Sequence, residues 1–583
     1  MLLAVTVALC AVNAHTQTRV PPVTTGWHGG SFHVDVAGVV GRSDIVLDRP
    51  NLEASQAMPL GNGRVGVAVW SEDGFTAQLN RADAMPGRLS AGQVVIPGLA
   101  KLVRAVDYAG RVDLYRGEFV ERGGGMTATA YVEPNADLLV VDVTGADPAA
   151  GQTVQLKLWE PRAPIAGTLK NAAWLAESWV DNKAPGASGQ SFGTLAVVTA
   201  EGRGVTTQVT DKRTVTIRFK PDASGHFRVV VAAPHYDGKV EPVMTAMRAL
   251  TPARTGGGRA AHAAWWASFW KRAGLIRVVS ADGVGAYMEN LRMIYLYVAA
   301  CERGEDWPGS QAGVADMISA ARDVHKWDPS AFWHWNLRMQ VAANLGAGLS
   351  DLNLPYFDLY LNNLDNITYW TRTHMHGLSG SCVPETMRFN GQGYEYEGAW
   401  IPPSTGLNCD ADSKPYYNAR TLSTGAEIGL WVWRQYLATR DDTFLEKYFP
   451  LMGASARFLL AAQYQGKDGK LHTGPSNAHE TQWDVVDPTT DLAAIKALYP
   501  AVDQATALLD LDRQLAYGLR TALDHTPEFP RVRIDDPKKL VAPSADALQQ
   551  DMIADSYKPD AKIHNVENIG LEPVWPYNLI GDR

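Results

Sequence analysis

Several features that mark particular classes of protein are rare or missing in this sequence. Only 4 of the 583 residues are cysteines, and no cysteines and histidines have the spacing of zinc ligands. The formal net charge is −9 without any basic block, which argues against a nucleic-acid partner. No glycine-rich phosphate loop and no Gly-x-Ser-x-Gly motif occurs, so the sequence specifies neither a cofactor nor a metal.

Long apolar runs are also scarce, and the one that matters lies at the start of the chain. Residues Leu2 to Val12 are mostly apolar, although no basic residue precedes them. Val12-Asn13-Ala14 resembles the small-residue site at which signal peptides are cleaved. No later run is long enough to span a bilayer. We therefore predict a signal peptide over residues 1–14 and a secreted or periplasmic protein without a membrane span.

Cleavage at this site would leave three cysteines, Cys301, Cys382 and Cys409. An odd number leaves at least one thiol unpaired unless a bridge forms between chains. The internal pair that we favour is Cys382 with Cys409.

The length and the pattern of the chain predict more than one domain. A chain of 583 residues is too long for one ordinary core. From about residue 27 to 234, apolar residues alternate with small or polar ones, for example at Val65, Val67 and Val69. This period of two is typical of antiparallel strands with one buried face. We predict an antiparallel β-sandwich over residues 27–250.

The pattern changes near a glycine run at residues 256–258, and helical periodicity follows it. We predict a linker helix over residues 251–275 and a helical domain over residues 276–583. The residues expected on the buried face of its first helix are Leu291, Ile294, Tyr295 and Val298. The predicted fold class is therefore α+β, with two domains in series.

The aromatic content favours a carbohydrate ligand. Of the 18 tryptophans, 13 follow residue 258. Indole rings stack well on sugar rings, although core packing is their commoner use. A long loop over residues 377–417 is rich in glycine, proline and aromatic residues such as Trp400. Loops of this length in a compact domain are usually functional or disordered, and the aromatic residues argue against disorder.

The strongest catalytic candidate is Glu480, in a turn-like run over residues 473–483. His479 and Trp483 flank it. A glycosidase needs a proton donor at the glycosidic oxygen, and a neighbouring indole would desolvate such an acid and raise its pKa. The alternative is a carboxylate that binds the free N–H groups at a helix start, which is a common arrangement.

Two other segments carry candidate site residues. Trp335, Asn336 and Arg338 lie within one polar and aromatic run, which could also be an ordinary helix end. Glu385 and Asn390 lie in the long loop, where Glu385 is a competing acid, or else a solvated loop carboxylate. We count Trp335, Glu385, Asn390 and Trp400 as candidate sugar-binding residues, together with His479 and Trp483.

Several short segments, in order along the chain, resemble a known family. In the first half they are Pro59-Leu60-Gly61-Asn62-Gly63-Arg64-Val65-Gly66 and Leu79-Asn80. In the helical half they are Gly425-Ala426-Glu427-Ile428, Phe449-Pro450-Leu451-Met452 and Gly474-Pro475-Ser476. As an ordered block they resemble a divergent branch of the α-L-fucosidase family of glycoside hydrolases, family 95. The resemblance runs from about residue 50 to the C-terminus.

This resemblance implies an (α/α)6 barrel over residues 276–583 and an inverting reaction. The family uses a glutamate as acid and a water held by two asparagines and an aspartate. Glu480 is similar in position to the acid, and Asn336 to the first asparagine. Arg338 stands in place of the second asparagine. A permanent cation there would change what activates the water, which brings fucose specificity into question.

The aspartate of the family has no counterpart in this sequence. After residue 276 we count about seven or eight helical segments, too few for the six hairpins of a closed barrel. We therefore expect an incomplete barrel, truncated at its C-terminus, with the base in the missing segment. If the barrel closes within this chain, Asp484, Glu567 or Glu572 would be the base.

Together these observations predict a secreted inverting glycoside hydrolase, with an oligosaccharide or polysaccharide as its partner. It would remove a terminal α-L-fucoside or related sugar from polysaccharide or glycan side chains. One alternative is a noncatalytic carbohydrate-binding protein on the same scaffold. The other is a glycoside phosphorylase or a lyase; in a phosphorylase, Arg338 would bind phosphate. The sequence does not specify the oligomeric state.

The signal peptide can be tested directly. We expect the protein recovered outside the cytoplasm to begin at His15, because cleavage follows Ala14. N-terminal sequencing of the exported protein would measure this, and a sequence that starts at Met1 would contradict it.

Overall fold

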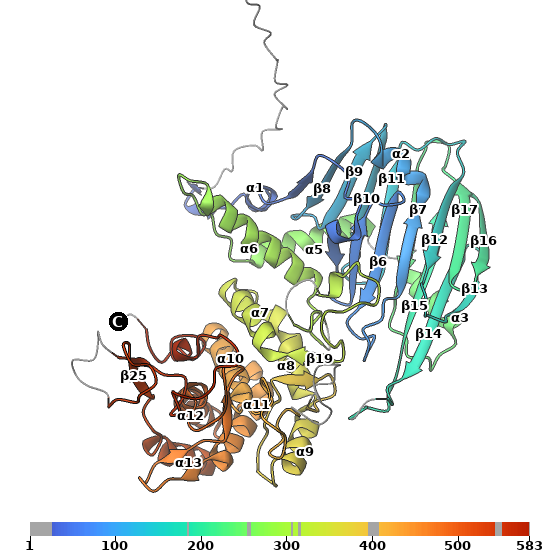
Figure 1. Cartoon of the computed structure of the whole chain (residues 1–583). Coiled ribbons are helices and arrows are strands. Elements are labelled where there is room, and N and C mark those ends of the chain that lie inside the picture. Colours follow the sequence, from blue (N-terminus) through green and yellow to red (C-terminus); the bar gives the residue numbers. More distant parts are fainter. Residues whose placement is uncertain are drawn as a thin grey trace, which may run out of the picture.

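The structure, a computed structural model, describes residues 26–183, 186–252, 258–304, 307–312, 316–393, 407–542 and 551–581. A pair of antiparallel sheets is followed by a lobe of helices, as Figure 1 shows. The predicted order of a β-sandwich and then a helical domain is confirmed. The predicted signal peptide and Trp400 lie outside the described residues.

The two sheets of the sandwich differ in size, and neighbouring strands in both are antiparallel. The larger sheet has nine strands, in the order β13 (Ile165–Thr168), β14 (Ala172–Val180), β15 (Ser191–Glu201), β18 (Phe227–Ala232), β11 (Leu138–Thr144), β10 (Met126–Val132), β9 (Glu118–Gly123), β8 (Ala109–Asp113) and β3 (Ile45–Leu47). The smaller has seven, in the order β16 (Arg203–Asp211), β17 (Thr214–Lys220), β12 (Gln152–Lys157), β7 (Gly92–Ile96), β6 (Phe75–Arg81), β5 (Val65–Trp70) and β4 (Met58–Gly61). Shorter elements of this half are β1 (Gly26–His28), β2 (Ser31–His33), α1 (Val36–Gly41), α2 (Ala100–Val103) and α3 (Pro242–Ala249).

One hydrophobic core lies between the sheets. Val67 of β5 pairs with Leu79 of β6, and Val141 of β11 pairs with Val229 of β18. All four side chains are fully buried in the same cluster. In β12 burial alternates residue by residue, as the period of two predicted.

Strand β5 departs from that prediction because all six of its residues are buried. The outer face of β5 is covered by a short helical turn, Asp316–Ile318, from the helical half of the chain. A Cβ atom added to Gly66 would lie 2.6 Å from the carbonyl oxygen of Met317. The small residues that alternate with valine therefore make room for a second packed layer, not for solvent.

The second half is helical, with short strand pairs between its helices. The helices are α5 (Gly258–Arg272), α6 (Val284–Cys301), α7 (His334–Gly346), α8 (Leu354–Leu361), α9 (Leu364–His374), α10 (Thr424–Thr439), α11 (Asp442–Ala462), α12 (Thr489–Leu509) and α13 (Arg513–Asp524). The strand pairs are β19 (Ala331–Trp333) with β20 (Thr386–Arg388), β21 (Tyr464–Gln465) with β22 (Leu471–His472), β23 (Ser476–Ala478) with β24 (Gln482–Val485), and β25 (Arg531–Arg533) with β26 (Asp551–Ile553).

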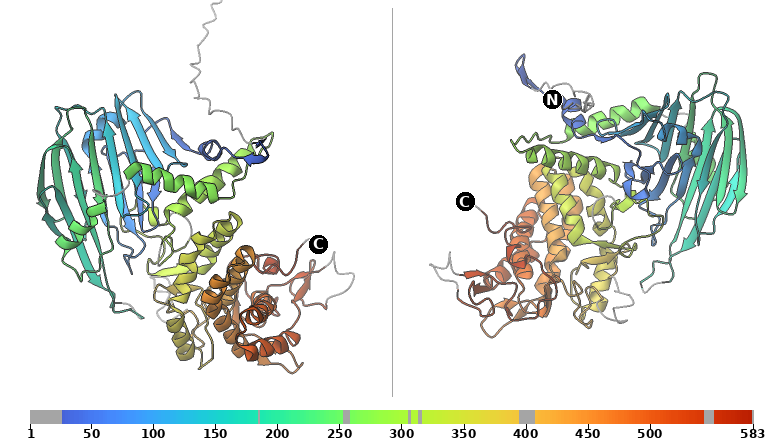
Figure 2. Two further views of the ribbon diagram at one scale, coloured as in Figure 1. Left: turned by 180° about the vertical axis from the view of Figure 1, so that it is seen from behind. Right: turned by 45° about the horizontal axis from the view of Figure 1, so that its top comes forward.

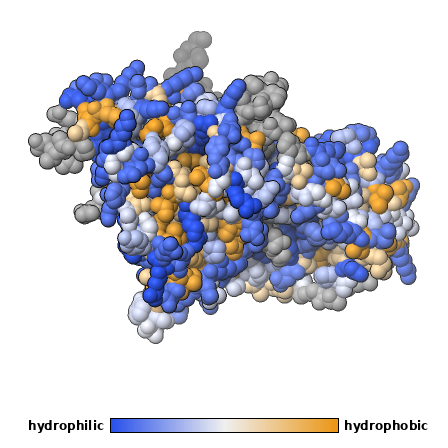
Figure 3. Space-filling model, turned by 90° about the horizontal axis from the view of Figure 1, so that it is seen from below, coloured by the Kyte–Doolittle hydropathy of each residue, from blue (hydrophilic) through white to orange (hydrophobic). Residues whose placement is uncertain are grey.

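From residue 276 onward, the described ranges contain eight α-helices, fewer than six hairpins would need. None of the helices in the described ranges is both long and apolar enough to cross a bilayer. This helical lobe also exposes large apolar side chains, including Leu508, Tyr517 and Leu571. Figure 3 shows apolar residues among hydrophilic ones on its lower face.

Helices α5 and α6 pack against the sandwich, and Figure 2 shows them between the sheets and the remaining helices. Trp266 of α5 stacks on Tyr297 of α6, with ring centroids 5.0 Å apart, and the Tyr297 hydroxyl donates to the carbonyl of Pro59 at 2.8 Å. The buried residues of α6 include Met293, Leu296 and Tyr297. The face predicted from the sequence is wrong in part, because Leu291 is 46% exposed. Packing on the sandwich, which the helical period alone does not encode, selects the buried face.

The Gly61-Asn62-Gly63 segment joins the two halves of the molecule. The Gly63 N–H donates to the carbonyl of Cys301, at the end of α6, over 2.8 Å. The Asn62 side-chain amide donates to the carbonyl oxygens of Glu133 and Ala136 at 2.9 and 3.0 Å. Gly63 has φ +91°, a conformation that suits glycine. This part of the sequence is thus a junction between sheet and helix.

One disulfide closes the loop that follows α9. Cys382 and Cys409 are bonded, with Cα atoms 5.9 Å apart, so the predicted pair is confirmed. Cys301 is a free thiol, buried at the end of α6.

A glycine substitution would test the junction. We expect Gly63→Ala to lower the free energy of unfolding by about 2–4 kcal/mol, because the new Cβ would lie 2.5 Å from the backbone nitrogen of Gly304 at a positive φ. Gly125→Ala is the matched control. Its φ is +78°, but nothing lies within 4 Å of the added atom, so we expect the free energy of unfolding to fall by only about 1 kcal/mol. Equal losses in urea unfolding would contradict this account.

Candidate active site

Glu480 lies in the turn of a short β-hairpin made by β23 and β24. Helix α12 begins only at Thr489, so the alternative of a helix-start carboxylate is wrong. The neighbouring residue His479 has φ +43°, which turns the chain between the two strands. The hairpin therefore presents two consecutive ionisable side chains from one turn.

The carboxyl group of Glu480 is partly buried beside other carboxyl groups. The Asn565 side-chain amide donates to its Oε2 at 2.8 Å, and Glu567 accepts the Glu480 backbone N–H at 3.1 Å. Burial raises the pKa of Glu480 to about 7; the hydrogen bond from Asn565 opposes this, and the charges of Glu567 and Glu385 add to it. A carboxyl group with this pKa is partly protonated at neutral pH, as a general acid must be.

The last described segment of the chain supplies these neighbours of Glu480. Ile563 forms a bridge with Gln482 of β24, and the His564 N–H donates to the carbonyl of Thr481 at 2.9 Å. The His564 ring stacks on Trp483, with centroids 3.6 Å apart and planes 7° apart. The hairpin and this segment therefore form one unit.

His479 points the other way, into the protein. Its Nε2 lies 3.0 Å from Glu572 Oε1, and its ring meets Trp335 edge-on at 4.3 Å between centroids. Burial lowers the pKa of His479, but the carboxylate of Glu572 outweighs burial, so the net shift is upward. We interpret His479 and Glu572 as a buried ion pair that holds the hairpin against α7.

Arg338 is the centre of this buried cluster. Its guanidinium lies between two indoles, 3.5 Å from the Trp335 ring centroid and 4.8 Å from that of Trp575. Its Nη1 donates to Glu427 at 2.8 Å and lies 3.7 Å from Glu572. Only 2% of the side chain is exposed. These contacts suit a residue that positions others better than one that holds a catalytic water.

Glu427 and His334 are residues of this cluster that the sequence analysis did not single out. His334 Nε2 lies 3.3 Å from Glu427. Burial would raise the pKa of Glu427, but Arg338 and then His334 outweigh it and hold this pKa well below its usual range. His334 precedes Trp335, and Glu427 lies in one of the segments that resemble the fucosidase family. The two residues are 93 positions apart in the sequence, and no local pattern indicates that they are in contact.

Glu385 is buried, so the alternative of a solvated loop carboxylate is wrong. It accepts hydrogen bonds from the Trp335 N–H at 2.8 Å, from the Thr386 hydroxyl at 3.1 Å and from the Asn418 amide. Its backbone carbonyl accepts the His334 N–H at 2.9 Å. Glu385 thus fixes the start of α7, and its charge acts on Glu480.

The structure brings together most, but not all, of the candidate residues. Those that meet are Glu480, His479, Trp335, Arg338 and Glu385, with Asn336 beside Trp335 on α7. The indole N–H of Trp483 donates to the backbone carbonyl of Glu480 at 3.0 Å. Asn390 instead donates to Gly186, between β14 and β15, at 2.9 Å.

The three candidate bases, Asp484, Glu567 and Glu572, lie in different surroundings. Asp484 is paired with Arg420 at 2.7 Å on the outside of the hairpin. Glu572 is buried and committed to His479. Glu567 is partly exposed next to Glu480, and burial is the main cause that raises its pKa. Glu567 is therefore the candidate base that solvent reaches beside the acid.

A cavity of about 440 Å³ adjoins this cluster on α7. Its lining residues are Tyr295, Ala312, Trp335, Asn336, Met339, Gln340 and Ala343. The volume is within the range of small-ligand sites, about 300–1,000 Å³. Asn336 and Trp335 therefore face a space that a sugar ring fits.

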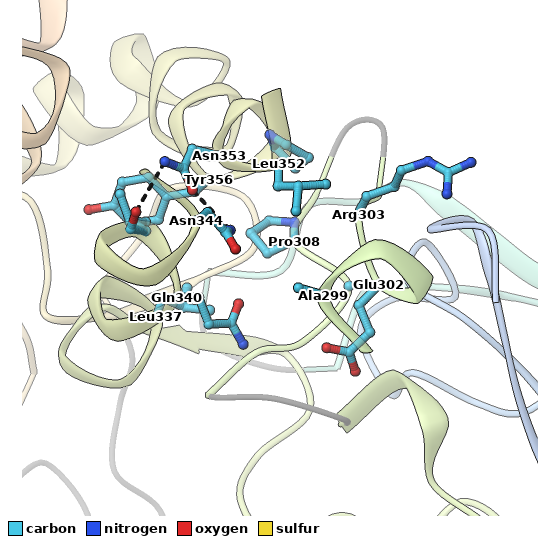
Figure 4. Close-up of a pocket in the computed structure, with 13 residues that line it drawn as sticks. Ala299, Glu302, Arg303, Pro308, Leu337, Gln340, Asn344, Leu352, Asn353 and Tyr356 are labelled. Carbon is cyan, nitrogen blue, oxygen red and sulfur yellow. Dashed lines mark hydrogen bonds between the residues drawn. The ribbon is translucent and has the colours of Figure 1, made fainter. Parts of the chain in front are cut away.

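A second cavity, between α6, α7 and the start of α8, is far smaller. Figure 4 shows Asn344 and Asn353 at this cavity, where the Asn344 amide donates to Asn353 at 3.0 Å. Its volume is about 30 Å³, which suits one or two water molecules and excludes a sugar. The described residues contain no group of three or more metal-ligating side chains.

Comparison with known proteins gives a distant relative. No family model matches the chain. It is 26% identical over 213 residues to alpha-L-fucosidase 2 of Arabidopsis thaliana, an alignment that covers 35% of this chain and 23% of the plant protein. The aligned part thus spans about a quarter of that relative's length.

Solved structures resemble the chain over more of its length. A human-microbiome protein provisionally named a kojibiose phosphorylase superposes with a TM-score of 0.57 and 11% identity, covering 83% of this chain and 70% of that one. A family 92 glycosyl hydrolase has a TM-score of 0.44 and 12% identity, over 91% of this chain and 68% of its own. The first likeness supports the fold: a β-sandwich joined to a helical domain.

Removal of the central guanidinium would test the buried cluster. We expect Arg338→Met to lower the free energy of unfolding by about 3–5 kcal/mol, because Glu427 would remain buried without its main partner. The double variant Arg338→Met with Glu427→Gln should recover part of the loss. Urea unfolding would measure both.

The matched control is Arg457→Met on α11, which breaks a more exposed pair with Asp512, the residue before α13. We expect a loss below about 1 kcal/mol there. Similar losses for the two single variants would contradict the structural role that we assign to Arg338.

Proposed function

We propose that this chain is a secreted glycoside hydrolase that removes a terminal sugar from polysaccharide or glycan side chains with inversion. The sugar is an α-L-fucose or a related residue. The observation that carries the proposal is Glu480, a carboxyl group in a hairpin turn whose pKa is raised to about 7 beside other acidic side chains. The distant relationship to a plant α-L-fucosidase supports the reaction class and the sugar.

In this mechanism Glu480 donates its proton to the glycosidic oxygen as the bond to the sugar carbon breaks. The leaving group departs as an alcohol, and Glu480 becomes a carboxylate. Among the described carboxyl groups we assign the second step to Glu567: it takes a proton from a water as that water bonds to the sugar carbon from the opposite face, which inverts its configuration. The Asn336 amide, beside the cavity, orients this water or the sugar hydroxyls.

A glycoside phosphorylase is the second candidate, because the solved structure with a TM-score of 0.57 carries that name. In this chain Arg338 is fully buried and paired with Glu427, so it does not offer its guanidinium to phosphate. Product analysis by NMR separates these functions. Hydrolysis yields free sugar of inverted configuration with or without phosphate, whereas a phosphorylase yields a sugar phosphate only when phosphate is added.

Substitution of the acid tests the proposal. We expect Glu480→Gln to reduce kcat on natural glycosides by about 10²–10⁴-fold, because the leaving group would depart without a proton. Glycosides with an acidic phenol as leaving group should lose far less, since they need no proton. Steady-state kinetics on both substrates would measure the difference.

Two further variants complete this test. Glu567→Gln should reduce the hydrolysis of both substrates, because the water must be activated in each case. Asp484→Asn, in the same hairpin but paired with Arg420, should leave kcat unchanged. If wild-type protein binds sugar without hydrolysing it, the chain is a noncatalytic binding protein. If Glu385→Gln abolishes activity and Glu480→Gln does not, Glu385 is the acid.

A further inference from the structure

We propose that a cavity where the sandwich meets the helical half is a second sugar-binding subsite, which takes a neutral sugar ring in the rest of the substrate chain. This junction cavity is lined by Gly63, Arg64, Arg81, Ala82, Asp83, Asp137, His235 and Trp307. The inference deepens the function proposed above and depends on it for the identity of the substrate.

The junction cavity is a built site, because its charged side chains hold one another in fixed positions. Arg81 donates to both oxygens of Asp83, at 2.7 and 2.9 Å, and to Asp137 at 2.7 Å. Arg64 donates to the other oxygen of Asp137 at 2.6 Å. Only 5% of the Arg81 side chain is exposed. A network of this kind presents preorganised polar groups to a ligand.

Guanidinium and carboxylate groups alternate in this network, which favours a ligand whose groups both donate and accept hydrogen bonds. Arg64 and Arg81 carry two positive charges, and Asp83 and Asp137 carry two negative ones. Burial would raise the pKa of Asp83, but Arg81 and His235 outweigh it and keep this carboxyl ionised. A uronate or sulfate would meet two carboxylates here, and a cation would meet two guanidinium groups. Sugar hydroxyls, which both donate and accept, suit both kinds of partner.

Two side chains add the features that a sugar ring needs. Trp307 supplies an indole beside the polar groups, as in sites where a ring stacks on an aromatic face. His235 binds Asp83 through Nδ1 at 2.7 Å, and with 63% of its side chain exposed it can turn Nε2 to a ligand. The volume of about 380 Å³ is in the range of small-ligand sites.

The junction cavity is connected to the candidate active site by packed residues. The Trp307 ring meets Phe389 edge-on, with centroids 6.1 Å apart. Phe389 follows β20 directly, and β20 begins one residue after Glu385. The same β20 segment therefore carries Glu385 at one end and supports the wall of the junction cavity at the other. For this cavity to act as a subsite, a substrate longer than one sugar must extend from the catalytic hairpin to it.

The experiment compares a long and a short substrate in the full chain. The probes are a neutral oligosaccharide that carries a terminal α-L-fucose, and 4-nitrophenyl α-L-fucoside, which has a single sugar. We expect Trp307→Ala to raise KM for the oligosaccharide about tenfold, and KM for the aryl fucoside by less than twofold, with kcat unchanged. His235→Ala, on an exposed side chain, should have the same pattern with a smaller rise. The matched control is Trp27→Ala, at an exposed tryptophan near the start of the chain. It should change KM for neither substrate.

Binding of the oligosaccharide, measured by calorimetry on wild-type and Trp307→Ala protein, separates this inference from the proposed function. A wild-type protein that hydrolyses neither probe, but binds the oligosaccharide through Trp307, would contradict the function and support the subsite. Hydrolysis with KM unchanged in both Trp307→Ala and His235→Ala would overturn the subsite and leave the function. A sulfated oligosaccharide that binds more tightly than the neutral one would overturn the assignment to a neutral ring. Absence of both binding and hydrolysis would overturn both proposals.

Discussion

The buried charge of Arg338 is the constraint on which the candidate active site depends. A guanidinium that is 2% exposed must be paired, and here it is paired with Glu427 and lies near Glu572. Glu572 in turn holds His479, which is adjacent to Glu480. Helix α7, helix α10, the hairpin and the last described segment therefore meet at one cation. A shift of any of these would leave a charge unpaired in the interior, at a cost of several kcal/mol.

The arrangement also explains how carboxyl groups in one site have different pKa values. Glu427 lies against a cation, so its pKa is held low and it stays ionised. Glu480 instead lies next to Glu567, and burial raises its pKa to about 7. Separation of pKa values by environment is what acid–base catalysis requires of chemically identical groups. In the proposed reaction the buried cluster would act indirectly, because it fixes the hairpin that carries Glu480.

Much of the fold follows from patterns that are local in the sequence. The alternation at β12, the change to helical periodicity after residue 258 and the pair Cys382–Cys409 are all found in the structure. Glu480 and His479 were identified because several functional groups are adjacent in one short run. The features that the sequence analysis missed are long-range. The buried outer face of β5 depends on residues more than 240 positions away, and the buried face of α6 depends on the sandwich. Glu427, His334 and Asn565 gain their places only through partners that lie far along the chain, and no local period encodes such contacts.

The central claim is that Glu480 acts as a general acid with a raised pKa. The measurement that tests it most directly is the pH dependence of kcat/KM for hydrolysis of a natural glycoside. Because the acid must hold its proton, the rate should fall as pH rises through an apparent pKa of about 7. With a substrate that has an acidic phenol as leaving group, this alkaline fall should be weak. An alkaline limb that lies below pH 5, or one that is equally steep for both substrates, would contradict the account.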